Sequence, residues 1–385
     1  MTDDKKKIIG RALAKIVARA QSGFEPAVIG LMAAGGELGP AELLDGARLA
    51  QAEEPRHKVL AIGPRRPGYE DLDWLETGEG EADIAAAMEK ALNEGRLQGA
   101  VALHYPFPLG VTTIGRVLTP ARGRPLLLAS TTGTAAAQTA PALVLNALYG
   151  RAVARSLGLA EPTLGLLNIN GANQALRALT ALGAAGYPVK FGASGRADGG
   201  ALLRGNDLLN PGVDICLCDS LTGNVLMKLF SAWQTGGAYE ALGWGYGPST
   251  GAGWRRVISI ISRASGAPVV AGALKFNAAV IRGGLAQKVA EETAAADKAG
   301  LAGILAGLAP APPAAAEGVV KAPPARPTEE EIHGLDVLDI EAAVVCLWRE
   351  GLYAESAMGC TGPVVKVPRD VLGAAKDCLK RHNYI

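Results

Sequence analysis

Short apolar runs that end in polar turn residues recur from about residue 26 to residue 290, and they alternate with segments of helical pattern. Four of these runs are Ala27 to Met32, Leu126 to Ala129, Thr163 to Ile169 and Asp214 to Cys218. Short strands separated by crossover helices are typical of an α/β fold with a mainly parallel sheet. Because ligands of such sheets bind where the strands end, the polar turns are the first places to search for a site.

Size and charge limit what this chain can bind. With 385 residues, of which 49% are hydrophobic, it can bury a large core and is expected to form two lobes. Its 38 basic and 37 acidic residues leave a net charge of +1, so no overall field attracts nucleic acid or an acidic membrane. No apolar stretch is long enough and free enough of charge to span a bilayer. Any ligand must therefore be recognised locally.

Composition divides the chain into four parts. Residues 1–22 carry an apolar stripe that predicts an amphipathic helix, docked on its own core or on a partner, or else lying on a membrane surface. Residues 23–307 form the α/β body. An Ala/Pro-rich linker follows at residues 308–328, and residues 329–385 form a C-terminal module. In this module we expect a helix from Leu335 to Glu350, a strand from Val364 to Val367 and a helix opened by Asp370.

The five cysteines are an odd number without CxxC spacing, which indicates reduced thiols in the cytoplasm. Cys216 and Cys218 lie two apart in a predicted strand, and no second pair of ligands completes a zinc set, so we expect buried structural thiols and no metal site. Cys346 and Cys378 lie on predicted helices and are expected in a core. Cys360 differs, because flanking Gly359 and Gly362-Pro363 predict a tight turn that leaves its sulfur approachable.

Three polar segments are candidates for binding an anion or moving a proton. Ser130 to Thr134 follow a strand and precede a helix, so their hydroxyls and backbone N–H groups can cradle a phosphate, or can simply cap the helix. Arg196 and Arg204, the latter close to Asn206, stand among turn residues and suit phosphate or carboxylate, or solvated salt bridges. His104 ends the predicted strand Ala100 to Leu103 and is either a base or an ordinary hydrogen-bonding group.

The run from Gly236 to Gly253 is rich in glycine and aromatic residues. It does not follow a predicted strand, so it is neither a dinucleotide fingerprint nor a P-loop, which argues against a dehydrogenase. We expect a loop here, either a mobile one that covers the substrate or a structural one at a dimer interface.

Two stretches resemble the phosphate acyltransferase family of phospholipid synthesis: Leu157 to Leu159 with Gly165 to Ile169, and Cys218 to Lys228. The resemblance covers roughly residues 26 to 290. It implies a two-lobed fold similar to isopropylmalate dehydrogenase and phosphotransacetylase.

Further stretches resemble the family of alpha subunits of component C of glycine, sarcosine and betaine reductase, over nearly the whole chain. They are His104 to Gly110, Ser130 to Thr134, Arg196 to Gly200, Arg204 to Leu208, Tyr246 to Pro248 and Glu350 to Pro363. This resemblance implies an acetyl thioester on Cys360 that inorganic phosphate attacks to release acetyl phosphate. It implies a beta subunit and the selenoprotein component A as partners, a homo- or hetero-oligomer, and no cofactor beyond phosphate as co-substrate.

The predicted catalytic residues are Cys360 and His104. The residues expected to bind substrate are Ser130, Thr131, Thr132, Gly133, Thr134, Arg196, Arg204, Asn206, Asp219, Thr222, Asn224 and Lys228. Two other hypotheses stay open. The chain can be a phosphate acyltransferase for acyl carrier protein, in which Cys360 is incidental, or an organising subunit that only docks a catalytic partner.

Overall fold

The structure is a computed structural model that describes Val17 and residues 26–385, apart from residues 122, 196–198, 309–319, 337–338, 360 and 361. The expected N-terminal helix over residues 1–22 therefore lies outside the described residues except for Val17, as does the middle of the Ala/Pro linker. Within the described part, no single helix is long and apolar enough to cross a membrane, although α8 (Ala267–Arg282) and α9 (Leu285–Lys298) pass that test together as a pair bent by 59°.

In the described part of the body, eleven strands form one sheet in the order β3-β2-β1-β4-β11-β10-β5-β6-β9-β7-β8. The strands are β1 Ala27–Met32, β2 His57–Gly63, β3 Asp73–Glu76, β4 Gly99–Ala102, β5 Val111–Leu118, β6 Pro125–Thr134, β7 Leu164–Leu167, β8 Leu202–Leu203, β9 Ile215–Leu217, β10 Gly247–Thr250 and β11 Ile258–Ile260.

The sheet has two parallel halves that meet at an antiparallel centre. Strands β3, β2, β1, β4 and β11 pair in parallel, and so do β6, β9, β7 and β8. Between them, β10 is antiparallel to both β11 and β5, and β5 is antiparallel to β6. The predicted α/β class with a mainly parallel sheet is confirmed.

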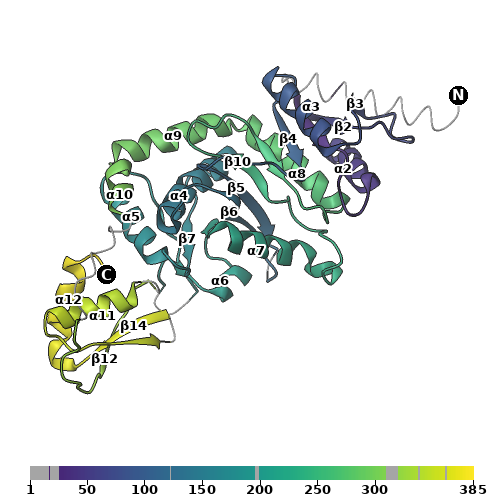
Figure 1. The fold of residues 1–385 in the computed structure, drawn as a ribbon. Helices are drawn as coiled ribbons and strands as arrows, with labels where there is room; N and C mark the ends of the chain where they lie inside the picture. The colour runs from purple at the N-terminus through teal and green to yellow at the C-terminus, as the bar shows by residue number, and fades with distance from the viewer. Residues whose placement is uncertain are drawn as a thin grey trace, which may run out of the picture.

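Helices cover the sheet on both sides (Figure 1). Around the half that carries β1 to β4 lie α2 Pro40–Glu53, α3 Glu81–Asn93 and α8. Around the other half lie α4 Thr139–Ser156, α5 Ala172–Ala184, α6 Gly205–Leu209, α7 Ser220–Ala232, α9 and α10 Leu301–Gly307. A short 3-10 turn, Trp233–Thr235, follows α7. Helix α4 is buried along nearly its whole length, because it packs between β6 and β9 on one side and α9 on the other.

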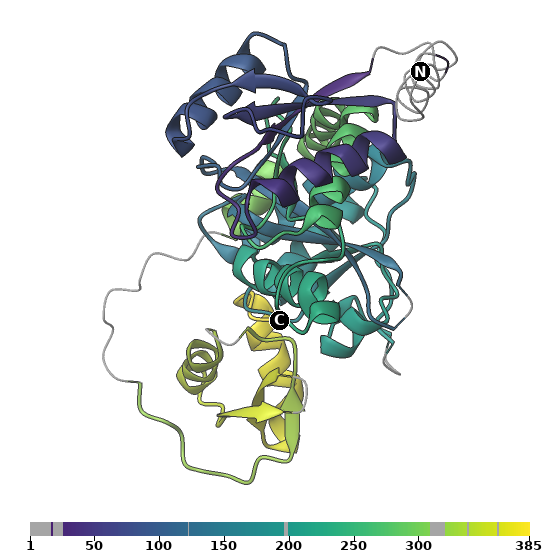
Figure 2. The same ribbon diagram turned by 90° about the vertical axis from the view of Figure 1, so that its right-hand side faces the viewer.

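The C-terminal module is a small antiparallel sheet with two helices. Its strands, in the order β12-β14-β13, are β12 Glu330–Ile332, β13 Glu355–Gly359 and β14 Gly362–Val367. Helix α11 spans Ile340–Arg349, and a 3-10 turn at Arg369–Val371 leads into α12 Leu372–Arg381. Both views show this module, in yellow, outside the body's sheet (Figures 1 and 2).

Side chains of α5 attach the module to the body. Gln174 donates a hydrogen bond to the Asp339 carboxylate at 2.7 Å. Arg177 donates to the carbonyl oxygens of Gly334 at 3.4 Å and Asn383 at 3.3 Å. These contacts reach both the entry to α11 and the end of the chain, so they dock the module at two points.

The structure corrects two expected elements. The glycine-rich run Gly236 to Gly253 is not a loop throughout, because Gly247–Thr250 is β10 at the centre of the sheet. A Cβ at Gly247 would lie 1.8 Å from the Ile114 carbonyl oxygen, so a glycine is needed for this strand to approach β5. The helix expected from Leu335 starts only at Ile340, because Leu335 is buried and Gly334 and Asp339 contact α5.

Candidate active site

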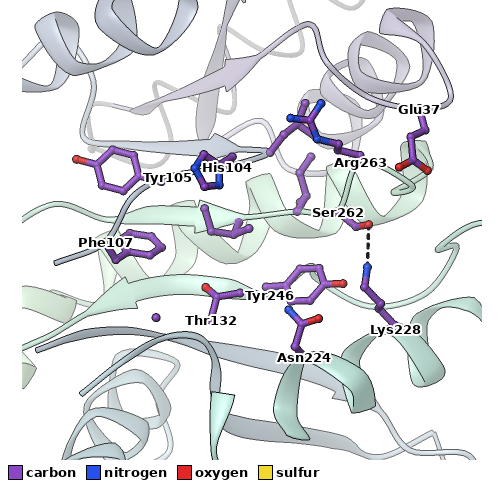
Figure 3. Close-up of a pocket in the computed structure, with 14 residues that line it drawn as sticks. Glu37, His104, Tyr105, Phe107, Thr132, Asn224, Lys228, Tyr246, Ser262 and Arg263 are labelled. Atoms are coloured by element: carbon purple, nitrogen blue, oxygen red, sulfur yellow. Dashed lines mark hydrogen bonds between the residues drawn. The ribbon is translucent and has the colours of Figure 1, made fainter. Parts of the chain in front are cut away.

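A cavity of about 480 Å³ opens where the two halves of the sheet meet. Its walls come from the segment after β4, the end of β6, helix α7, Tyr246 before β10 and the segment after β11. Figure 3 shows His104, Tyr105 and Phe107 on one side, with Asn224 and Lys228 of α7 facing them across the cavity. The cavity therefore lies at strand ends, as expected for a sheet of this class.

Lys228 is the predicted cation that reaches this cavity. Its side chain is 55% exposed, and its Nζ lies 3.4 Å from the Ser262 hydroxyl and 3.8 Å from Glu240 Oε1. Glu240 is buried and also accepts hydrogen bonds from the Tyr246 hydroxyl at 3.0 Å and the Ser265 hydroxyl at 2.9 Å. None of these contacts to Lys228 is short, so its ammonium group retains donors for a ligand.

Arg263 also lines the cavity but is already engaged in an ion pair. Arg263 donates to both carboxylate oxygens of Glu81, at 2.8 and 3.1 Å, and this bond raises the pKa of Arg263 and lowers the pKa of Glu81. His104 is exposed, and its charge lowers the pKa of Glu81 further. Burial, together with Glu240, raises the pKa of Tyr246 well above its usual value, so its hydroxyl stays protonated as a hydrogen-bond donor.

The predicted phosphate cradle, Ser130 to Thr134, is not a turn after a strand but the end of β6 itself. Two of its backbone N–H groups already donate hydrogen bonds within the protein. Ser130 donates to the Cys218 carbonyl at 3.0 Å and Thr132 donates to the Thr113 hydroxyl at 3.0 Å. Thr131 is buried and hydrogen bonds to the Thr113 hydroxyl at 2.7 Å. The predicted cradle of free N–H groups is therefore wrong for Ser130 and Thr132, and of the five residues only Thr132 and Gly133 line the cavity of about 480 Å³.

Ser130 and Thr134 line a second, smaller cavity of about 170 Å³, together with Asp219. Asp219 caps α7: its carboxylate accepts hydrogen bonds from the Thr222 backbone N–H at 2.9 Å and hydroxyl at 2.6 Å. Asp219 and Thr222 therefore position α7, and the Asn224 amide fixes the helix to β6 by donating to the Thr131 carbonyl at 3.3 Å.

The remaining predicted residues lie apart from this region or outside the description. Arg204 precedes α6, its backbone N–H donates to the Asp207 carboxylate at 2.8 Å, and neither Arg204 nor Asn206 belongs to the two cavities. Arg196 and Cys360 lie outside the described residues. Cys216, Cys218, Cys346 and Cys378 are buried as predicted, and burial raises the pKa of Cys216 to about 12.

Known proteins similar to this chain agree with its motifs. A family model described as fatty acid synthesis protein matches residues 27–366. The chain is also 44% identical, over 380 residues and 98% of both chains, to the glycine/sarcosine/betaine reductase complex component C subunit alpha of Peptoclostridium acidaminophilum. The chain belongs to the fatty acid synthesis protein family. Its predicted resemblance to component C alpha subunits is confirmed by the second match.

A solved structure of a branched-chain phosphotransacylase from Enterococcus faecalis V583 is also similar, at 18% identity and a TM-score of 0.48, and covers 66% of this chain and 99% of that chain. The match to the fatty acid synthesis protein family runs from the first residue of β1 to Lys366 in β14 of the small sheet. It therefore includes both the main cavity and the segment that carries Cys360.

Sequence reasoning missed Ser262 and Arg263, which line the cavity, and Glu240, which contacts Lys228 and Tyr246. Ser262 and Arg263 follow β11 after Ile261, at the end of an apolar run, so the signal that found His104 also applies to them. Glu240 lies within the glycine-rich run and carries no comparable signal, because only the fold brings it to Lys228 and Tyr246.

Proposed function

We propose that this member of the family is the acyltransferase subunit of a reductase complex, and that it converts an acetyl thioester on Cys360 and inorganic phosphate into acetyl phosphate. The observation that carries the proposal is the cavity in which Lys228 and Asn224 face His104, in a chain 44% identical to a component C alpha subunit. That relative is named as a subunit of a complex, and we propose that this chain also acts within a complex. We propose a beta subunit and the selenoprotein component A as its partners, in the cytoplasm.

In this proposal phosphate binds at the α7 side of the cavity. Lys228 supplies a positive charge that no short ion pair occupies, while Arg263 keeps its bidentate pair with Glu81 and shapes the wall. Asn224 lies on the same helix as Lys228, and Thr132 lines the cavity from β6; both offer neutral polar groups that orient the anion (Figure 3). Phosphate is a modest nucleophile, so binding and positioning contribute more than a strong base.

The transfer is balanced without a further reactant. A phosphate oxygen forms a bond to the thioester carbonyl carbon, the carbon–sulfur bond breaks, and its electron pair stays on the Cys360 sulfur as thiolate. The proton that monohydrogen phosphate loses passes to His104 at the cavity wall or to the departing thiolate. The products are acetyl phosphate and the free cysteine, ready for the next acetyl group.

Trapping the acetyl group on the full chain tests the proposal. The chain is incubated with its reductase partners and a labelled two-carbon substrate in the absence of phosphate, then digested to find the labelled peptide. We expect the label on Cys360, its loss in Cys360→Ser, and its release as acetyl phosphate when phosphate is added. Ser356→Ala, on exposed β13, serves as the matched control. Undiminished thioester and acetyl phosphate in Cys360→Ser would overturn the proposal.

A second candidate is a phosphate acyltransferase that takes acyl carrier protein thioesters. The family description and the apolar wall of the cavity, which includes Leu103, Phe107 and Ile260, favour it. Such an enzyme forms long-chain acyl phosphates from long-chain acyl thioesters, and Cys360→Ser leaves its rate unchanged. A chain that binds the beta subunit but turns over neither class of thioester has only an organising role.

A further inference from the structure

Three potential metal ligands meet between the two helices of the C-terminal module. Cys346 lies on α11, Cys378 lies on α12, and His382 follows four residues later at the end of α12. Their ligand atoms all lie within 4.8 Å of one another, and the two sulfur atoms are 3.7 Å apart. Because residues four apart share one face of a helix, Cys378 and His382 point to the same place.

The separation of the sulfurs fits one bound ion. Tetrahedral Zn²⁺ with Zn–S bonds of about 2.3 Å holds its two sulfur ligands about 3.8 Å apart. Two thiolates and an imidazole are the soft and borderline ligands that favour Zn²⁺ over Mg²⁺ or Ca²⁺. His382 is exposed whereas Cys378 is fully buried, so the fourth position faces the solvent and suits a water molecule.

The module has a physical need for such a link. Residues 329–385 form a unit well below about 70–80 residues, a size at which a single hydrophobic core rarely suffices for stability on its own. The core of this unit is built around Cys346, Cys378 and their apolar neighbours, and both thiols are free. An ion bound by α11 and α12 would hold the two helices together behind the strands β13 and β14 on either side of Cys360.

The charges around the cluster are compatible with a cation. Arg381 interacts with the Cys378 thiol, but Glu350 accepts hydrogen bonds from its guanidinium at 2.7 and 2.8 Å and so compensates its charge. A bound Zn²⁺ would be held by two thiolates, whose charges cancel the charge of the ion.

We propose that Cys346, Cys378 and His382 bind a Zn²⁺ ion that links α11 to α12 and stabilises the module that carries Cys360. This assignment goes beyond the proposed acyl transfer and does not depend on it. It also differs from the expectation, drawn from the sequence, that Cys346 and Cys378 are only core residues and that the chain has no metal site.

Titration of the metal-free full chain with Co²⁺ tests the site, because Co²⁺ reports thiolate ligands through near-ultraviolet charge-transfer absorption and tetrahedral geometry through visible bands. We expect one Co²⁺ per chain, displaced by Zn²⁺, and a higher thermal midpoint with Zn²⁺. His382→Gln should weaken binding at least tenfold, and Cys346→Ala should reduce the charge-transfer band. His333→Gln, an exposed histidine of the same module, and Cys360→Ser should leave both signals unchanged.

Several results would overturn the proposal. One is the absence of charge-transfer absorption in the folded wild-type chain, and another is full binding by His382→Gln. A third is a Cys346–Cys378 disulfide in protein purified without reductant, because the two sulfurs would then be bonded to each other and could not bind the ion as thiolates. Since His382 is exposed, its replacement is not expected to unfold the module, and circular dichroism of the variant checks this.

Discussion

Replacing Lys228 with methionine removes the positive charge that we assign to phosphate binding while keeping most of the side chain's length. Two unit charges about 4 Å apart interact by about 4 kcal/mol near a protein surface. Because the Lys228 side chain is 55% exposed, solvent and salt reduce this value, and we take about half of it, ~2 kcal/mol. A change of ~2 kcal/mol corresponds to a roughly 30-fold rise in the KM for phosphate.

The assay is the phosphate dependence of acetyl phosphate release by the assembled complex, with labelled acetyl supplied as the thioester. Lys228→Met should accumulate the thioester on Cys360 at low phosphate and recover part of its rate at high phosphate. Lys228→Arg should lose less, because it keeps the charge, and replacement of the exposed Lys298 of α9, Lys298→Met, should behave as wild type. A KM for phosphate within twofold of wild type in folded Lys228→Met would refute the assignment.

Two further predictions concern stability. Glu292 and Arg151 form an ion pair of 3.0 Å with side chains 2% and 5% exposed, so Glu292→Gln should lower the free energy of unfolding by about 3–5 kcal/mol in denaturant titrations. Its neighbour Glu291 has a side chain that is 36% exposed, so Glu291→Gln should cost about 1 kcal/mol or less. Burial lowers the pKa of His57 to about 4. The unfolded chain therefore takes up a proton below about pH 6.5 that the folded chain resists. The free energy of unfolding should fall by about 3 kcal/mol between pH 7 and pH 4. His57→Phe should flatten this dependence, and equal slopes in the two proteins would contradict it.

The strands of this fold could be predicted where an apolar run ends abruptly. The run Ala27 to Met32 coincides with β1, and the runs before residues 168 and 219 contain β7 and β9. The central strand β10 could not be predicted this way, because glycine at 247 signals a loop. That glycine is required instead by its close approach to the Ile114 carbonyl oxygen, a contact between residues far apart in the sequence.

The sequence predicted several residues of the candidate site, but it predicted their roles less well. His104, Asn224 and Lys228 were expected from their motifs and lie at the cavity. Ser130 to Thr134 carry hydroxyls that resemble a phosphate-binding turn, but Thr113 on the neighbouring strand binds Thr131 and the Thr132 backbone N–H and keeps the segment in the sheet. Pairing partners of this kind cannot be read from the local sequence.

The stretch from Asp219 to Lys228 shows why one short motif can build the α7 wall of the cavity. Its first residue caps α7, and Gly223 allows the helix to press against β6, since a Cβ there would lie 1.8 Å from the Ser130 carbonyl oxygen. Asn224 and Lys228 are four residues apart and share the helix face that lines the cavity. The charge proposed to bind phosphate therefore projects from a rigid element whose position is fixed by the cap, by the glycine contact and by the Asn224 hydrogen bond to Thr131. A residue other than glycine at position 223 would move Lys228 together with the whole helix, so the precision of the proposed phosphate site depends on a residue that does not line the cavity.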